Sequence, residues 1–155
     1  MTQNSAKARL SPSPRNKSQR ENHPARVRLA SIAAELLLAL LPYQDESGLW
    51  YQITNRENQP DNWLESSCSC LYAAGLFMAV RLGFLSVERL APAKKAAAGI
   101  MRYVDEDAND LLVRNICVGT GVGDYPFYAA RPTSVNDLHG VGSFLLMCTE
   151  GAKIL

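Results

Sequence analysis

The strongest constraint on the fold of this chain is a helical stretch, residues 63–82, that carries almost no polar side chains. From Cys68 to Val80 there is no charged residue, and Ser69 is the only hydroxyl or amide residue outside the aromatics. A helix that is apolar on every side is buried on every side. Other elements must therefore surround this segment, which predicts an all-α fold with an inner helix.

Four helical stretches are predicted, and exposed and buried helices alternate along the chain. Residues 24–41 and 87–104 carry charged side chains and are expected to face outward. Residues 63–82 and 137–154 are nearly uncharged and are expected to be neighbours in an inner layer. The first helix is amphipathic and should lie on another element with the apolar side that is formed by Leu29, Ile32, Ala33, Leu36 and Leu40.

Capping residues place the ends of the two buried helices. Asn62 and Asn136 are predicted N-caps, and Gly83 is expected to end the first buried helix. Gly140 and Gly142 lower the helix propensity of the second one. We expect them to permit a close approach of backbone or access of a ligand.

The two connections that lead from an exposed to a buried helix are long, residues 42–62 and 105–136. Each contains a strand-like piece, residues 48–54 and 111–118. If the two buried helices run in the same direction, their amino ends and both long loops share one end of the molecule. Long loops on a rigid scaffold are the usual place for a functional site, and helix amino ends favour anionic groups such as carboxylates.

Residues 1–22 are predicted to be a disordered basic tail, followed by one folded domain over residues 23–155. The first 20 residues hold five basic and no acidic side chains, and after Met1 the only large apolar residue of the tail is Leu10. No secretory signal or membrane-spanning segment is recognisable, so we expect a cytoplasmic protein without a membrane partner. Cations are not gathered on any predicted helix, which argues against nucleic acid as a partner.

The four cysteines are interpreted as buried free thiols, because all lie in apolar surroundings and Cys68 and Cys70 would point apart on a helix. We therefore predict no zinc site at these cysteines. The glycine-rich run at residues 119–124 leads into Tyr-Pro rather than a helix, so it is not interpreted as a phosphate-binding loop. Trp50 and Tyr51 are interpreted as packing residues.

Three segments resemble a known family: QDESGLWYQI (44–53), DNWLESSCS (61–69) and VGTGVGDYPFYAARPTSVNDLHGVGSFLLMCTE (118–150). They are similar to the unsaturated rhamnogalacturonyl hydrolases of glycoside hydrolase family 105, to which the unsaturated glucuronyl hydrolases of family 88 are related. The resemblance implies a six-hairpin (α/α) toroid. Two hairpins are recognisable here, so the chain is expected to form the C-terminal part of such a toroid.

The resemblance also implies a reaction, the removal of a Δ4,5-unsaturated uronic acid from the non-reducing end of an oligosaccharide. It implies neither a metal nor an organic cofactor. In the family, an aspartate protonates the C4=C5 vinyl ether and water adds at C5, after which the hemiketal opens and releases the sugar. The segment that carries this aspartate has no counterpart in the 155 residues. We therefore expect the isolated chain to be inactive.

Six residues near the predicted amino ends of the buried helices are candidate substrate-binding residues: Trp63, Glu65, Ser66, Arg131, Asp137 and His139. Aromatic planes stack on sugar rings, and polar groups bind their hydroxyls. Each polar candidate also has an alternative role. Glu65 and Asp137 could instead cap their helices, and His139 could be a packing residue. Arg131 could instead form an ion pair with Asp124 or Asp137. The expected partner is an unsaturated uronyl oligosaccharide. The alternative is a non-catalytic helical remnant that binds oligosaccharide, complements another chain, or self-associates through exposed toroid edges.

Overall fold

The computed structural model describes residues 23–107 and 109–155, so the predicted tail at residues 1–22 lies outside the described residues. The described part is mostly helical, with three two-stranded antiparallel ladders in its connections. Its elements are α2 (Pro24–Leu40), η1 (Leu41–Tyr43), β1 (Trp50–Tyr51), β2 (Leu64–Glu65), α3 (Ser66–Arg81), η2 (Val87–Arg89), α4 (Leu90–Ile100), η3 (Met101–Tyr103), β3 (Val104–Asp107), β4 (Asp110–Val113), β5 (Ile116–Cys117), α5 (Tyr125–Ala129), β6 (Thr133–Ser134) and α6 (Leu138–Gly151).

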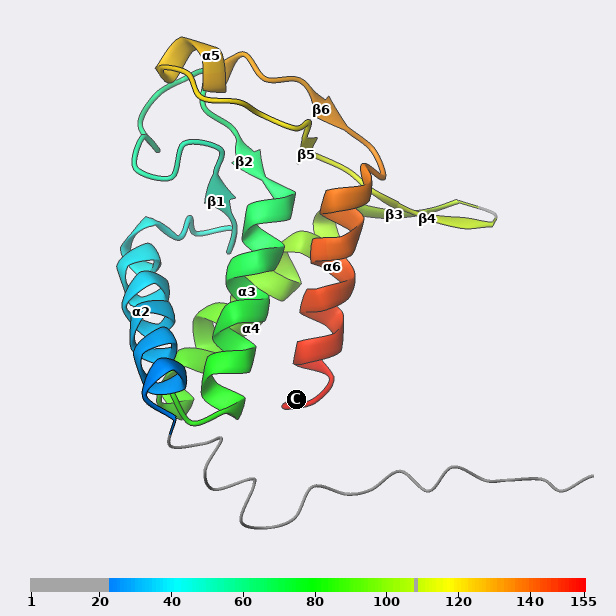
Figure 1. Ribbon diagram of the computed structural model, residues 1–155. Helices are drawn as coiled ribbons and strands as arrows, with labels where there is room; N and C mark the ends of the chain where they lie inside the picture. The colour runs from blue at the N-terminus through cyan, green and yellow to red at the C-terminus, as the bar shows by residue number, and fades with distance from the viewer. Residues whose placement is uncertain (1–22, 108) are drawn as a thin grey trace, which may run out of the picture.

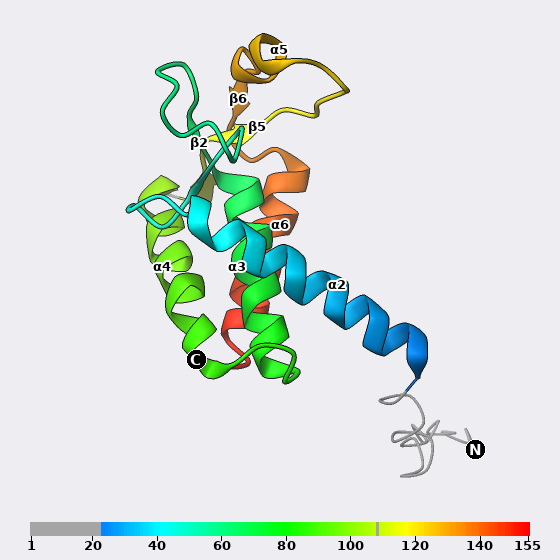
Figure 2. The same cartoon turned by 90° about the vertical axis from the view of Figure 1, so that its left-hand side faces the viewer.

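Helix α3 is the centre of the fold, as the uncharged stretch predicts. It packs against α6, α4 and α2, and Figures 1 and 2 show these helices on different sides of it. Ala73, Leu76 and Phe77 of α3 are no more than 1% exposed. The core is therefore built around this helix, and the burial of its apolar side chains is the main stabilising contribution.

Helices α3 and α6 lie side by side and run in the same direction (Figure 1). Their amino ends lie at the end of the molecule that also holds β1, β2, β5, β6 and the short helix α5. The predicted pair of parallel inner helices, with both long connections at one end, is confirmed. The loop strands were also expected: β1 and β5 lie within the two predicted strand-like pieces, and β4 begins one residue before the second piece, at Asp110.

The first buried helix begins later than predicted, at Ser66 rather than Trp63. Leu64 and Glu65 are extended because they pair with Tyr51 and Trp50 of β1. Glu65 is therefore the N-cap, and its side chain accepts hydrogen bonds from the backbone of Ser67 and Cys68. Asn62, the predicted cap, instead donates from Nδ2 to the Ile53 and Arg56 carbonyls and organises the preceding loop.

The N-cap of the second buried helix also differs from the prediction, here by one residue. Asp137 caps α6, and its carboxylate accepts from the His139 backbone N–H. Asn136, the predicted cap, adopts a left-handed φ of 53°. Its side chain accepts from the Val113 N–H at 2.8 Å and donates to the Leu111 carbonyl at 3.0 Å. Asn136 thus fastens the entry of α6 to β4.

Several apolar side chains of α2, α3 and α6 that were predicted to be buried are exposed. In α2, Leu29, Ile32 and Leu36 are between 52% and 66% exposed, and Leu37 instead packs toward Gly75 of α3. Leu71 of α3 is 48% exposed, and Leu145 of α6 is 58% exposed. Apolar composition identified these helices correctly, but no described element covers these side chains.

The third predicted helix, residues 87–104, is divided into η2, α4 and η3, and its last residue begins β3. The loop before β1 crosses α4 at very short range. A methyl group on Gly99 would lie 2.3 Å from the Ser47 carbonyl oxygen, and Gly48 has a φ of +98°. Both positions therefore require glycine.

Trp50 is a packing residue, as predicted. It is fully buried, its indole N–H donates to the Leu40 carbonyl at 2.7 Å, and its ring meets Tyr72 edge-on. Helix α5 corrects another expectation, because the glycine-rich run does lead into a short helix that Asp124 caps. Over residues 23–107 and 109–155, the helices are too short or too polar to cross a membrane.

Candidate functional site

Glu65 joins three segments at the amino end of α3. Its carboxylate accepts hydrogen bonds from the N–H groups of Ser67 at 3.0 Å, Cys68 at 2.5 Å and Cys117 at 2.9 Å, and from the Ser67 hydroxyl. The side chain is 1% exposed. Two carboxylate oxygens have about four acceptor positions, and these four donors use them. Glu65 thus holds β5 against the start of α3.

Two serines of α3 complete this junction. The Ser66 hydroxyl donates to the Arg114 carbonyl at 2.8 Å, and its N–H donates to the Asn115 carbonyl at 3.0 Å. The Ser69 hydroxyl donates to the Glu65 carbonyl and accepts from the Trp50 N–H. Both serines are fully buried. The predicted site residue Ser66 therefore lies behind the junction and fixes the segment between β4 and β5.

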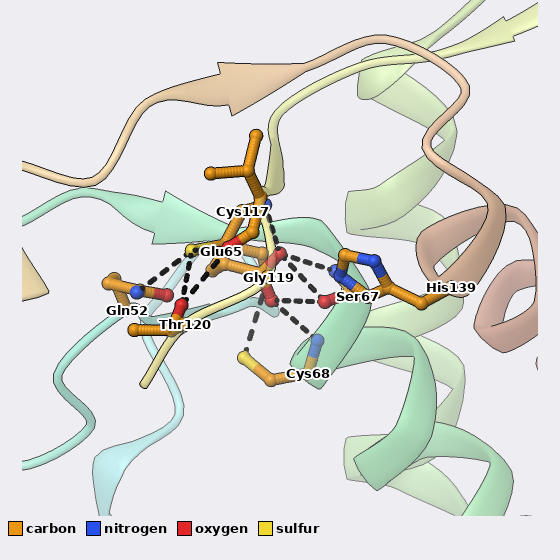
Figure 3. Close-up of a pocket in the computed structure, with 9 residues that line it drawn as sticks. Gln52, Glu65, Ser67, Cys68, Cys117, Gly119, Thr120 and His139 are labelled. Carbon is orange, nitrogen blue, oxygen red and sulfur yellow. Dashed lines mark hydrogen bonds between the residues drawn. The ribbon is translucent and has the colours of Figure 1, made fainter. Parts of the chain in front are cut away.

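A pocket of about 320 Å³ opens above this junction (Figure 3). The amino end of α3, the chain that follows β5 and the first turn of α6 contribute to its walls. Of the six predicted site residues, Glu65 and His139 line it. The lining residues are Gln52, Glu65, Ser67, Cys68, Cys117, Val118, Gly119, Thr120 and His139.

The side chains of His139 and Asp137 contact each other at the amino end of α6. The Nδ1 atom of His139 lies 2.5 Å from Asp137 Oδ1, and both side chains are partly exposed. Figure 3 shows His139 extending from α6 toward Ser67 at the amino end of α3. The contact with Asp137 orients the ring, so the Nε2 edge is free to act as a polar group of the pocket.

The amino ends of both inner helices are already occupied by carboxylates of this chain. Glu65 caps α3 and Asp137 caps α6. These side chains take the position that an anionic ligand would favour at a helix amino end. An anionic ligand in this pocket would therefore need a cation or another donor.

Arg131 and Trp63 lie among the loops beside the pocket. The Arg131 guanidinium donates to the carbonyl of the pocket residue Gly119 at 2.6 Å and lies over the Phe127 ring. Its buried Nε has no acceptor among the described residues. The Trp63 indole N–H donates to the Ala129 carbonyl at 3.3 Å. The alternative ion pairs of Arg131 with Asp124 and Asp137 are not formed, because these carboxylates cap α5 and contact His139.

A hydrogen bond connects the two long loops next to the pocket. The Tyr125 hydroxyl donates to Asp61 Oδ1 at 2.5 Å, which ties α5 to the loop before β2. Desolvation, followed by this hydrogen bond and the Asp61 charge, raises the pKa of Tyr125 to about 12. The hydroxyl therefore stays protonated, and the hydrogen bond to Asp61 is kept, even near pH 10, where an ordinary tyrosine ionises.

Two cysteines line the pocket, which the sequence prediction did not include in the site. Burial, reinforced by the charge of Glu65, raises the pKa of Cys68 well above its usual value. The Cys117 thiol contacts Gln52 Nε2 at 3.0 Å. A protonated thiol is a poor nucleophile, so Cys68 contributes to the wall rather than to chemistry. Cys148 corrects the prediction that all four thiols are buried, because it is exposed.

Sequence reasoning missed most of the pocket wall. Gln52, Ser67, Cys117 and Thr120 come from three segments that meet only through the β1–β2 pairing and the Glu65 contact with β5. The nearest available signal was the strand-like character of residues 48–54 and 111–118. Among the described His, Cys, Asp and Glu residues, none form a group of three that could hold a metal ion.

Comparisons with known proteins place this chain among carbohydrate-active enzymes. The profile described as Glycosyl Hydrolase Family 88 matches residues 19–155. The chain is 33% identical over 100 residues to the unsaturated rhamnogalacturonyl hydrolase YesR of Bacillus subtilis, covering 64% of this chain and 26% of that protein. It is 26% identical over 141 residues to the 24.9 kDa protein in the picA locus of Rhizobium radiobacter, covering 81% and 60%.

Solved structures agree with these sequence matches. A family 105 glycoside hydrolase of C. acetobutylicum ATCC 824 superposes with a TM-score of 0.81 at 29% identity, covering 86% of this chain and 40% of that one. A possible family 105 member from Klebsiella pneumoniae gives a TM-score of 0.74 at 28% identity, covering 86% and 33%. The chain therefore spans less than two thirds of each of these relatives.

Proposed function

This chain belongs to Glycosyl Hydrolase Family 88, and from that premise we propose that it forms one wall of a cavity that binds a Δ4,5-unsaturated uronyl oligosaccharide. The observation that carries the proposal is the convergence of the amino ends of α3 and α6 on one pocket, with His139 at its edge. The related Bacillus subtilis protein is named as an unsaturated rhamnogalacturonyl hydrolase, which supports this substrate class.

The proposed reaction of the whole enzyme is hydration of the C4=C5 vinyl ether of the terminal uronate. A proton is added at C4 and water adds at C5, and the resulting hemiketal opens to release the sugar that was bound at C1. We propose that the acid for the first step lies outside these 155 residues, since no carboxylate is free in the described pocket. Glu65 is fully used by four donors, and Asp137 is held by His139 and its backbone.

The candidate residues then divide into two proposed roles. His139 offers Nε2 to a sugar hydroxyl, and Arg131 is the nearest proposed cation for a carboxylate because its guanidinium adjoins Gly119 of the pocket wall. Glu65, Ser66 and Asp137 position these groups through their hydrogen bonds. Trp63 supports α5 beside the cavity through its contact with Ala129. We propose that the helices form part of a six-hairpin toroid, with α3 and α6 in its inner ring.

Binding and turnover test different parts of the proposal. We expect the 155-residue chain to bind an unsaturated rhamnogalacturonyl disaccharide, observed by NMR shifts of the Ser67, Cys117 and Gly119 amides, without consuming it. Turnover is followed by loss of the ultraviolet absorbance of the C4=C5 bond. His139→Ala should weaken binding, whereas His23→Ala, at the far end of α2, should not. Rapid turnover by the chain alone would contradict the assignment of the acid to another segment.

A second candidate function is a non-catalytic helical module that complements another chain. The exposed apolar stripes of α2 and α6, which include Leu29, Ile32, Leu36, Leu145 and Leu146, favour it. Contiguous exposed apolar surface drives association. We therefore propose that these edges bind a further helical segment or a second copy. Co-expression with the N-terminal segment of a family 105 relative should restore turnover if the chain is part of a split enzyme, and should not if it is a remnant.

A further inference from the structure

A second pocket of about 350 Å³ lies against β6. Its walls come from η3, from the turn between β4 and β5, and from β6 with the residue that follows it. None of the residues of the first pocket line it. The lining residues are Arg102, Tyr103, Arg114, Asn115, Thr133, Ser134 and Val135.

Most of the polar groups in this pocket have no partner. Within the described residues, the Arg102 guanidinium and the hydroxyls of Tyr103, Thr133 and Ser134 make no hydrogen bond or ion pair. This differs from the first pocket, where the Glu65 carboxylate is saturated by donors. The second pocket therefore presents one free guanidinium and three hydroxyls that can each receive or donate a hydrogen bond.

The second arginine of the pocket is held in a pair that a ligand can join. The Arg114 guanidinium contacts the Asp105 carboxylate at 2.7 and 3.0 Å. The two side chains are 48% and 49% exposed. Exposed pairs of this kind contribute little stability and exchange readily with solvent and ions. Two guanidinium groups and one carboxylate leave the pocket with a net positive charge.

Backbone hydrogen bonds hold the frame of this pocket in place. The Arg114 N–H donates to the Tyr103 carbonyl at 2.9 Å, and the Arg114 carbonyl accepts from the buried Ser66 hydroxyl. Thr133 is paired with Cys117 in the β5–β6 ladder. The backbone positions of the lining residues are thus set by the same junction that holds the first pocket, which favours binding without large reorganisation.

We propose that this second pocket binds the carboxylate of an acidic sugar, separately from the pocket at the amino ends of α3 and α6. The planar guanidinium of Arg102 receives the carboxylate, with Arg114 as the second cation, because arginine matches a planar oxyanion with two parallel hydrogen bonds. The hydroxyls of Tyr103, Thr133 and Ser134 contact the ring hydroxyls. The proposal rests on the proposed function only for the choice of a uronate as the ligand.

The test uses the 155-residue chain and three probes: sodium galacturonate, inorganic phosphate and glucose. Galacturonate should shift the amide signals of Tyr103, Asn115 and Ser134, and glucose should not. Arg102→Gln should weaken galacturonate binding roughly tenfold or more, since a hydrogen bond between charged groups is lost. Arg89→Gln is the matched control, because Arg89 precedes α4, whereas Arg102 follows it. Both side chains are exposed, so folding should be preserved.

Asp105→Asn provides a variant with the opposite expected effect. It removes the carboxylate that competes for Arg114, so galacturonate should bind about two- to fivefold more tightly. The proposal would be overturned if Asp105→Asn bound galacturonate more weakly than the parent chain. It would also be overturned if Arg102→Gln and the control Arg89→Gln lost equal affinity, or if the chain responded to phosphate but not to galacturonate. Binding that depends on His139 but not on Arg102 would overturn it while leaving the proposed function intact. Binding that depends on Arg102 but not on His139 would support it while counting against the first pocket.

Discussion

The replacement Glu65→Gln tests whether this side chain is a structural junction or a ligand for the substrate. Gln has nearly the same shape, but one carboxylate oxygen becomes an NH₂ group. The donors that face this position are the N–H groups of Ser67, Cys68 and Cys117 and the Ser67 hydroxyl. A donor would therefore face at least one donor in a site that is 1% exposed.

The expected cost follows from these contacts. One hydrogen bond to a charged acceptor is lost, which costs about 1.5–3 kcal/mol, and the orphaned N–H adds a desolvation penalty of roughly 1 kcal/mol or more. We therefore expect Glu65→Gln to lower the free energy of unfolding by about 3 kcal/mol. For a chain of this size, that corresponds to a fall in Tm of roughly 6–12 °C.

Thermal unfolding followed by circular dichroism measures this effect, with saccharide binding measured on the folded variant below its Tm. Glu35→Gln is the control, because Glu35 is an exposed residue of α2 that accepts from the Ser31 hydroxyl at 2.9 Å. It should melt within about 1 °C of the parent chain. An unchanged Tm for Glu65→Gln together with abolished binding would refute the junction role and identify Glu65 as a ligand.

Three further predictions concern other parts of the fold. In denaturant unfolding, Gly140→Ala should destabilise the chain by about 1–3 kcal/mol, since its methyl group would lie 2.5 Å from the Ile116 side chain. A methyl group at Gly142 would meet nothing within 4 Å, so Gly142→Ala should be neutral or stabilising by up to about 1 kcal/mol. Hydrogen bonds from Lys153 and Arg81 lower the pKa of Glu150, so its stabilising effect should be full above pH ~4.5 and be lost as the pH falls through the lower folded pKa. When the free energy of unfolding is measured against pH, Glu150→Gln should lack this loss of stability in acid. The same acid profile for Glu150→Gln and the parent chain would contradict the prediction. Exposed Cys148 should react first with a thiol reagent at pH 8, and Cys70, with a pKa of about 12, should react only on unfolding; equal rates in the folded chain would count against this burial.

The helices themselves could be predicted because their signals are local. The uncharged run from Cys68 to Val80 required a central helix, and the structure surrounds α3 on three sides. The resemblance of residues 118–150 to a hydrolase family agrees with the family match over residues 19–155. Helix starts were misplaced because capping depends on the preceding chain. Leu64 and Glu65 were predicted as helix, but pairing with β1 holds them extended.

The roles of the candidate residues could not be read from residue type. Glu65 and Ser66 are polar residues at a helix start, a pattern that fits a ligand and a cap equally well. Their roles follow from the position of β5, which lies about 50 residues along the chain and supplies the Cys117 N–H. The same applies to Arg102 and Arg114, which are separated in sequence and line one pocket because β3, which follows Arg102, pairs with β4, which precedes Arg114.

By itself, the sequence determined which segments are helical, which of them are central, and which enzyme family the chain resembles, since periodicity and motif spacing are properties of the chain alone. Only the tertiary structure decided which polar groups remain free. A hydrogen bond between distant segments uses up a donor or an acceptor, and this removes Glu65 from the set of available ligands. The Arg102 guanidinium has no such partner among the described residues, so it remains available to bind a ligand.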